Sequence, residues 1–239
     1  MRFTGQPLRL WIARFVVVPS VLLLLSGIGN AQSTTELKGW SEALQSTDVG
    51  SPVIRGSAKS TKDGLEVVAG GKDIWDTSDQ FHFAYQKKTG DFDVVVRVES
   101  LAATHLYSRA GLMARESLSP GSRHVFFLVF PDNRPRHKNR SAHELQYRAK
   151  KGGESAAIYP SQKPGPPAFP VEFPHVWLRL KRVGNRFTGF VSKDGKTWKE
   201  YGSYALDLPA TALLGLAATS EIETASTTVV FKDLNLLGK

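Results

Sequence analysis

The carboxylates of this chain are the first candidates for chemistry. Asp91 and Asp93 are two residues apart, a spacing that places both side chains on one face of a β-strand. Two carboxyl groups so placed can act as acid and base in the cleavage of a glycosidic bond. The next residues on that face are Val95 and Arg97, however, and Asp91 follows Gly90 at a turn, where a carboxylate usually caps backbone N–H groups. We therefore predict no pair of catalytic carboxylates.

Other catalytic signatures are missing from the sequence. It contains no Gly-x-Ser-x-Gly motif, no cysteine nucleophile, and no His-x-His or His-Glu-x-x-His spacing among its 6 histidines. The chain is therefore predicted not to be an enzyme. A hydrolase or lyase that acts on polysaccharides through an unrecognised site is the alternative.

Planar polar side chains and aromatic rings provide a sharper hypothesis, which is sugar binding. The C–H faces of a sugar stack on aromatic rings, and its hydroxyl groups pair with planar donors and acceptors. Alternation along the predicted strands puts suitable polar side chains on outward faces, and aromatic residues could supply rings at a rim. The candidate ligand-binding residues are Arg97, Arg115, Gln146, Arg148, Trp75 and Tyr107, with Tyr85 as a further ring. The alternative is that the arginines form ion pairs with Glu99 between strands and that Trp75 belongs to the core.

No metal or cofactor is expected from a motif. Asp48, Asp73, Asp76 and Asp79 could supply oxygen ligands to a structural calcium ion, but they lack the spacing of a known calcium loop. Turn capping is the simpler account of these aspartates, and structural calcium is the alternative.

The amino terminus predicts export. Arg2, Arg9 and Arg14 precede the apolar run Phe15–Leu25, and small residues follow up to Ala31, which is the pattern of a secretory signal peptide. We expect residues 1–31 to be removed and residues 32–239 to form a single periplasmic or secreted domain, with no transmembrane segment after cleavage. Retention of the apolar run as a membrane anchor is the alternative. The absence of cysteine favours a bacterial protein that depends on its core instead of disulfides.

Charge favours acidic partners. The chain carries a net charge of +9, three units of which lie in residues 1–31. Basic residues concentrate in 134–151 and again in 179–186. A glycan or another polyanionic polymer is the partner that such a surface suits, and no nucleic acid partner is expected. The alternative is that these residues form a solvated loop and the outer face of a strand.

Short runs of β-forming residues separated by turns predict an all-β fold. Strands are expected over residues 65–69, 80–86, 91–99, 110–116, 124–130, 144–150, 177–183, 186–192, 213–219 and 227–236, with another beginning near Trp198. In most of them apolar and polar residues alternate, which predicts one face in the core and one in solvent. The proline-rich stretch 160–174 is expected to cross between two sheets, because proline cannot serve in a central strand. About a dozen strands in one domain favour a two-sheet antiparallel jelly-roll sandwich.

Several phrases, taken together, carry a family resemblance. They are GGKDIWDTSDQFHF, TGDFDVVVRVESL, SRAGLMARESLSPGSRHV, ELQYRA, VWLRLKRVGNRFTGFVSKDGKTW, LLGLAATS and TTVVFKDLNL. From about Trp40 to Leu237 the chain resembles the secreted bacterial domains of the concanavalin A-like lectin/glucanase superfamily that carry the label "regulation of enolase", a family otherwise of unknown function. The resemblance implies a jelly roll of two curved antiparallel sheets that is usually non-catalytic and is often appended to larger carbohydrate-active or surface proteins. The Glu-x-Asp-x-Glu strand of that superfamily's glycoside hydrolases is missing here, and residues 192–198 resemble a shortened sialidase Asp-box, a structural turn.

Overall fold

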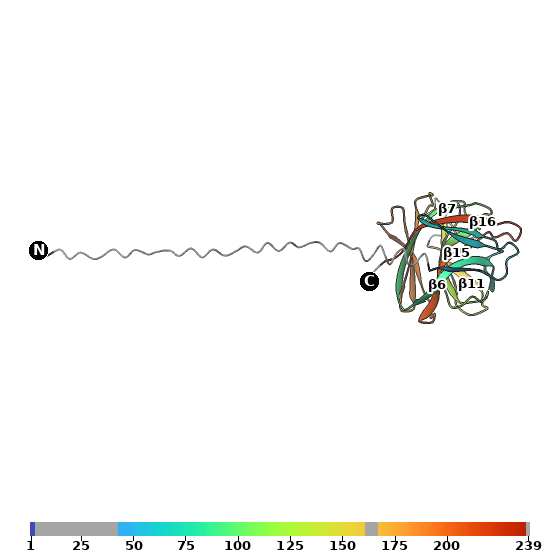
Figure 1. The fold of residues 1–239 in the computed structure, drawn as a ribbon, viewed down its shortest axis with the longest axis horizontal. Coiled ribbons are helices and arrows are strands. Elements are labelled where there is room, and N and C mark those ends of the chain that lie inside the picture. The colour runs from blue at the N-terminus through green and yellow to red at the C-terminus, as the bar shows by residue number, and fades with distance from the viewer. Residues whose placement is uncertain (3–42, 161–166, 238–239) are drawn as a thin grey trace. The chain divides into compact units, whose positions relative to one another are not determined.

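The computed structural model describes residues 1–2, 43–160 and 167–237, and within these residues all but two of the strands lie in two seven-stranded antiparallel sheets (Figure 1). Sheet A contains, in spatial order, β1 (Gln45–Val49), β6 (Phe81–Thr89), β15 (Thr211–Thr219), β8 (Arg109–Arg115), β9 (His124–Val129), β10 (His143–Arg148) and β11 (Ser155–Ile158). Sheet B contains β14 (Lys199–Ala205), β13 (Arg186–Ser192), β12 (Val176–Val183), β7 (Phe92–Leu101), β16 (Thr227–Leu236), β3 (Gly64–Ala69) and β2 (Ser57–Thr61). A small hairpin of β4 (Ile74–Trp75) and β5 (Ser78–Asp79) stands apart from both.

The main core fills the space between the two sheets. Sheet B contributes the alternate residues Val94, Val96 and Val98 of β7, and sheet A contributes residues such as Leu112 and Phe127, all fully buried in one apolar cluster. Because the side chains of a strand alternate between its two faces, one face of each sheet can pack into this cluster. The predicted core faces of β7 and β8 are therefore confirmed.

Sheet A is also apolar on its outer face, which the alternation argument did not predict. Phe81, Phe83, Met113, Phe126 and Leu128 form a second buried cluster on the side away from sheet B. Every residue of β8 and β9 is consequently buried. The expectation of a solvent-facing side for β8 and β10 is wrong, because the β4–β5 hairpin and neighbouring loops cover this face.

The strands predicted from apolar runs all form, with ends shifted by a few residues. The structure adds β1, β4, β5 and β11, and it makes a full edge strand of the short extended piece at β2. A tight turn at Val183-Gly184-Asn185 joins β12 to β13, with Gly184 at φ 60° as hairpin turns of this kind require. The chain crosses from β11 in sheet A to β12 in sheet B, so the predicted crossing loop is confirmed, and Phe169 and Val171 from its described part are buried in the main core.

The all-β, two-sheet antiparallel sandwich is thus confirmed, and the described residues contain no helix. Residues 3–31 of the predicted signal peptide and Trp40 lie outside the described residues. In the part of the chain that the structure describes, no helix has the length and apolar character needed to cross a membrane.

Candidate functional site

The outer face of sheet A carries polar side chains in rows across β8, β9 and β10. Strand register pairs Arg115 with His124 and His124 with Arg148, so these three side chains form one row. Two residues further along β10, Gln146 lies beside Phe126, and Glu144 lies beside Leu128 in the row after that. The face is therefore divided into a row rich in arginine and a neighbouring acidic and amide region.

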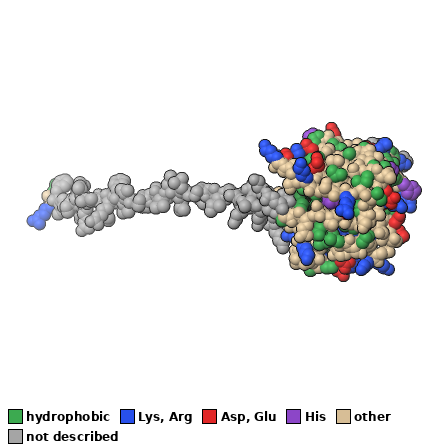
Figure 2. Space-filling view, turned by 45° about the vertical axis from the view of Figure 1, so that its right-hand side comes forward, with side chains coloured by type: hydrophobic (Ala, Val, Ile, Leu, Met, Phe, Trp, Pro, Cys, Tyr) green, Lys and Arg blue, Asp and Glu red, His purple; other side chains and the backbone are tan. Residues whose placement is uncertain are grey.

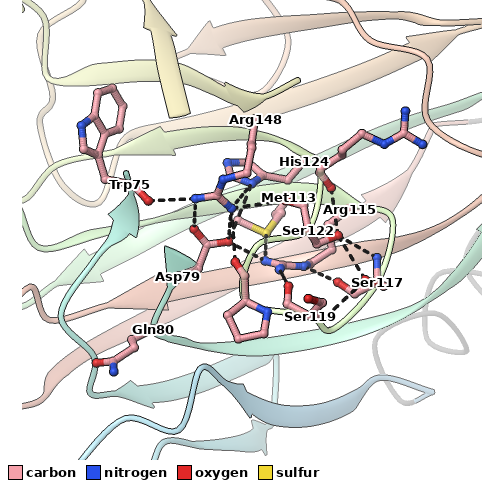
Figure 3. A network of polar contacts seen from close by, with 12 residues as sticks. Trp75, Asp79, Gln80, Met113, Arg115, Ser117, Ser119, Ser122, His124 and Arg148 are labelled. Atoms are coloured by element: carbon pink, nitrogen blue, oxygen red, sulfur yellow. Dashed lines mark hydrogen bonds and ion pairs between the residues drawn. The ribbon is translucent and has the colours of Figure 1, made fainter. Parts of the chain in front are cut away.

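The row of Arg115, His124 and Arg148 surrounds Asp79 of the hairpin (Figure 3). Arg148 donates to both carboxylate oxygens of Asp79, from Nη2 to Oδ1 over 2.6 Å and from Nη1 to Oδ2 over 2.8 Å. Arg115 Nη1 donates to Asp79 Oδ2 over 3.3 Å, and His124 Nδ1 lies 3.8 Å from the same oxygen. All four side chains are fully buried.

The two arginines also hold the surrounding loops. Arg148 donates to the carbonyl oxygens of Trp75 (2.8 Å), Asp76 (3.1 Å) and Gly153 (2.9 Å), and Arg115 donates to those of Ser117 and Ser119, both over 2.6 Å. Each nitrogen of both guanidinium groups has at least one acceptor. A planar, five-donor group is well suited to binding several carbonyls and a carboxylate at once. This cluster fixes the backbone of β4–β5, and with it the position of Trp75.

Burial of like charges perturbs the groups around Asp79. Burial lowers the pKa of His124 to about 4, and the two neighbouring guanidinium groups lower it further against the pull of Asp79. Burial likewise lowers the pKa of Arg115 to about 10, with Arg148 contributing repulsion. His124 is therefore neutral near pH 7, which limits the positive charge gathered around one aspartate.

Three of the six candidate ligand-binding residues occupy positions that do not suit that role. Arg115 and Arg148 have no solvent exposure, and their donors already bind Asp79 and backbone carbonyls. Arg97 belongs to sheet B, and its outward side chain pairs with Glu99 and with Asp233, from Nε to Oδ2 over 2.6 Å. The expectation that Arg97 and Arg115 share one side is corrected, because β7 and β8 belong to opposed sheets whose outer faces point apart.

The other three candidates, Trp75, Tyr107 and Gln146, line one pocket of about 230 Å³ on the outer face of sheet A. Its other lining residues are Asp73, Arg109, His137, Glu144, Tyr159 and Glu221. The pocket combines three aromatic rings with a floor of carboxyl, amide and guanidinium groups. Trp75 is half-buried and belongs to this wall, not to the main core.

Glu144 and Gln146 form the buried floor. The Glu144 carboxylate accepts from Asn139 Nδ2 at Oε1 and from Gln146 Nε2 at Oε2, both over 2.9 Å. The Gln146 side chain has no solvent exposure, and its Oε1 accepts no hydrogen bond from any described residue. A buried amide oxygen without a donor is costly by about 1–3 kcal/mol. This atom is therefore the strongest sign that the pocket is shaped for a ligand.

Arg109 joins two further carboxyl groups at the pocket wall. Its Nη2 lies 2.8 Å from Glu221 Oε2 and 3.1 Å from Asp73 Oδ1, while the Glu221 and Asp73 side chains are 14% and 26% exposed. Glu221 follows β15 and adopts φ 67°, a left-handed conformation that side chains rarely occupy. Such backbone outliers are concentrated at functional sites.

The pKa values of two of the carboxyl groups in the pocket are raised. Burial raises the pKa of Glu221 to about 8, and the nearby Asp73 carboxylate adds to this against the opposing charge of Arg109. Burial also raises the pKa of Glu144, again opposed by Arg109. Burial together with the charge of Glu144 raises the pKa of Tyr159 to about 12. Glu144 and Glu221 therefore hold a proton more tightly than exposed carboxyl groups do.

The aromatic walls are held by polar contacts of their own. The hydroxyl group of Tyr107 accepts from the backbone N–H of His137 over 3.0 Å, and its backbone carbonyl accepts from Arg109 Nε over 2.9 Å. The ring of Tyr107 also packs edge-on against Phe130 of the second cluster. Both the ring and the guanidinium group are therefore fixed before any ligand arrives.

Sequence reasoning missed Arg109, Glu144 and Glu221, and it considered Asp73 only as a ligand of calcium. Glu144 could have been identified from the sequence, because Glu144 and Gln146 are two residues apart on one strand and must share a face. Glu221 could not, since it lies 112 residues from Arg109 in the sequence and only the fold joins them.

Three of the four aspartates considered as calcium ligands pair with different basic side chains. Asp48 pairs with His82 over 2.8 Å and accepts from the Gly56 N–H, Asp73 pairs with Arg109, and Asp79 pairs with Arg148. No group of three or more potential metal ligands forms among the described histidine, aspartate and glutamate residues.

The basic segment 131–142 uses two of its arginines internally. Arg134 and Arg136 both pair with Asp132, and the Arg136 guanidinium lies buried over the ring of Phe130, 4.1 Å from its centre. In the second basic cluster, Arg179 makes a two-point ion pair with Asp93. On the face shown in Figure 2, basic and acidic side chains are interspersed instead of forming one large basic patch.

Comparison with known proteins supports the fold. No protein-family model and no curated protein sequence matches this chain. A functionally unknown protein from Saccharomyces cerevisiae is similar in structure at a TM-score of 0.59 and 18% identity, over 82% of this chain and 97% of that one. The GH43 protein BlXynB from Bacillus licheniformis matches at 0.49 and 10%, over 74% and 33%. Metal-free lectin I-B4 from Griffonia simplicifolia matches at 0.46 and 9%, over 82% and 94%. The similarity to the Saccharomyces cerevisiae protein agrees with the two-sheet antiparallel sandwich seen here.

Proposed function

We propose that the pocket on the outer face of sheet A binds a carbohydrate and that the protein is a non-enzymatic binding domain. The observation that carries this proposal is the buried, unpartnered Oε1 of Gln146 beside the buried carboxylate of Glu144. A sugar hydroxyl is a small donor that would remove the cost of leaving this acceptor unpaired, once a small movement of the Gln146 side chain opens Oε1 to the pocket.

The walls of the pocket suit the apolar faces of a sugar ring. Trp75, Tyr107 and Tyr159 line it alongside the polar floor. Aromatic rings offer flat apolar surfaces at which C–H groups can stack, and their polar edges remain hydrated. The volume of about 230 Å³ is below the roughly 300–1,000 Å³ of pockets that take drug-sized ligands. We therefore expect one sugar ring to enter and the rest of a glycan to lie outside.

A second candidate function is cleavage of the bound glycan. The observation that favours it is the paired carboxyl groups of Asp73 and Glu221, since the raised pKa of Glu221 keeps a proton available near neutral pH. Against it, both carboxyl groups are held by the same guanidinium of Arg109. Release of reducing sugar from a polysaccharide panel tests this candidate, and a lack of release across the panel leaves binding as the function.

Export to the periplasm or cell exterior and membership of the "regulation of enolase" family remain part of this proposal. Both fit a glycan-binding role, because the glycans of a bacterial envelope lie outside the cytoplasm. Processing of residues 1–31 is tested by amino-terminal sequencing of the protein recovered from its native host.

The direct test is a glycan-binding assay on the purified protein and two pocket variants. Trp75→Ala removes a stacking wall, and Gln146→Leu removes the unpartnered acceptor with little change of volume. Both are expected to lose glycan binding, whereas the control Trp198→Ala, on the outer side of sheet B, keeps it. Melting temperatures verify that each variant is folded. Unchanged binding in both folded pocket variants would refute the proposal.

A further inference from the structure

The pocket is rich in carboxyl groups, although the chain as a whole is basic. The protein carries a net charge of +9, yet the pocket gathers the carboxyl groups of Asp73, Glu144 and Glu221 around one guanidinium, that of Arg109. The guanidinium pairs directly with two of these carboxyl groups and neutralises only one charge. A surplus of acid therefore remains beside the aromatic walls.

An acidic cluster alone does not identify a ligand, but Gln146 supplies an independent indication. Its Oε1 is buried and has no donor among the described residues, and Gln146 is one of the residues that line the pocket. An ammonium group brings three N–H donors and no acceptor, so it can satisfy this oxygen and a carboxylate together. The rings of Trp75 and Tyr107 also attract a cation through their π faces.

The protonation of Glu221 also favours a cationic ligand. Glu221 faces Arg109 from β8, Asp73 from the loop before β4, and Glu144 from β10, with the side chains of Tyr107, His137 and Tyr159 completing the lining. Burial and the Asp73 carboxylate raise the pKa of Glu221 to about 8, so the pocket retains a proton near neutral pH. A ligand with its own positive charge can replace that proton.

We propose that the pocket selects sugars that carry a free, protonated amino group, as in deacetylated amino sugars, over neutral, N-acetylated and acidic sugars. This inference rests on the proposed carbohydrate-binding function and specifies its ligand class. The ammonium group lies against Gln146 Oε1 and the Asp73–Glu221 carboxyl pair, while the sugar ring stacks on the aromatic wall. Acidic sugars are repelled from the pocket even though the net charge of the chain would attract them.

Isothermal titration calorimetry of the purified protein tests this with four disaccharides at pH 6.5. The probes are β-1,4-linked glucosamine, its N-acetylated form, a neutral glucose disaccharide and a uronic acid disaccharide. We expect the glucosamine disaccharide to bind at least about tenfold more tightly than the N-acetylated and neutral forms. We also expect its affinity to fall with added salt, and the uronic acid not to bind. Titrations in two buffers of different ionisation enthalpy should show proton release on binding of the amino sugar.

Matched variants separate charge from shape. Glu221→Gln keeps the shape of the side chain and should remove both proton release and most of the preference for the amino sugar. Glu144→Gln should reduce the preference without relying on Glu221. The control Glu223→Gln makes the same charge change at an exposed position two residues away and should change neither.

The outcomes distinguish the two proposals. Equal affinity for amino, N-acetylated and neutral sugars would overturn the inference and leave carbohydrate binding intact. Tighter binding of the uronic acid would also overturn it. Binding of none of the four sugars, nor of any other glycan, would overturn the carbohydrate-binding proposal as well.

Discussion

Arg148 and Asp79 form a two-point ion pair in which neither side chain has any exposure to solvent. They lie 69 residues apart in the sequence and join β10 of sheet A to the β4–β5 hairpin above it. The same arginine donates to the carbonyl of Trp75 over 2.8 Å. The ion pair therefore connects the sandwich to the aromatic wall of the pocket, and several predictions depend on it.

Asp79→Asn is expected to destabilise the fold by about 3–5 kcal/mol, because removing the carboxylate leaves two buried guanidinium groups without a counter-charge. The measurement is the free energy of unfolding from urea titration. Asp63→Asn is the control, since the Asp63 side chain is 63% exposed and its loss should cost at most about 1 kcal/mol. Similar values for the two variants would contradict the role given to Asp79.

Arg148→Lys is expected to destabilise the protein although it keeps the charge. An ammonium group cannot reproduce the planar fork that binds both Asp79 oxygens together with the carbonyls of Trp75, Asp76 and Gly153. The hairpin should loosen, so amide hydrogen exchange at residues 74–79 should accelerate and glycan affinity should fall. The conservative control Arg186→Lys, at an exposed side chain, should leave both unchanged. Slow exchange in folded Arg148→Lys would show that other contacts hold the hairpin.

Glu221 should make the protein less stable as the pH rises. The pKa of its carboxyl group is raised to about 8 in the folded state, well above the value of about 4.3 in an unfolded chain. The folded state thus binds the proton more tightly, and this stabilisation is present at low pH and lost as the pH rises through 8. Glu221→Gln, which resembles the protonated form, should lose this dependence. The melting temperature of the variant minus that of the wild type should therefore increase between pH 5 and 9. A constant difference across that range would refute the assignment.

Apolar periodicity in the sequence was sufficient to predict most strands of the sandwich but not the strands at the edges of its sheets. The alternation of Val94, Val96 and Val98 predicts β7 because one face of that strand is core. β2 reads SAKST and is largely exposed, so its pairing with β3 depends on backbone hydrogen bonds that no apolar pattern reports. β1 likewise has only one fully buried residue, Val49.

The candidate site was only partly predictable, for two physical reasons. Alternation shows which residues share a face of a strand but not which sheet the strand joins, so Arg97 and Arg115 were placed together although they lie on opposed sheets. Outward polarity also does not imply exposure, because Arg115 and Arg148 are covered by the β4–β5 hairpin. Trp75, Tyr107 and Gln146 were identified from residue type and do line one pocket, whereas their role in binding remains a prediction.

The turn at residues 192–198 was predicted to be structural, with its aspartate capping backbone N–H groups, and this is confirmed. Asp194 Oδ1 accepts from the N–H groups of Lys196 and Thr197 over 2.8 and 2.7 Å. These N–H donors hold the pKa of Asp194 well below its ordinary value. Asp194→Ala should therefore accelerate amide exchange at Lys196 and Thr197 near pH 7 while leaving glycan binding unchanged. In the wild type the same acceleration should appear only at strongly acidic pH, once the carboxylate is protonated.

The central claim is that a sugar occupies the pocket beside Trp75 on sheet A. Its most direct test is a nuclear magnetic resonance titration of the indole N–H signals with the glucosamine disaccharide, in which Trp177 and Trp198, on the outer side of sheet B, serve as internal controls. We predict that the Trp75 signal shifts in a saturable manner and that the Trp177 and Trp198 signals do not move. Shifts confined to Trp177 or Trp198, or no shift at saturating sugar, would contradict the account.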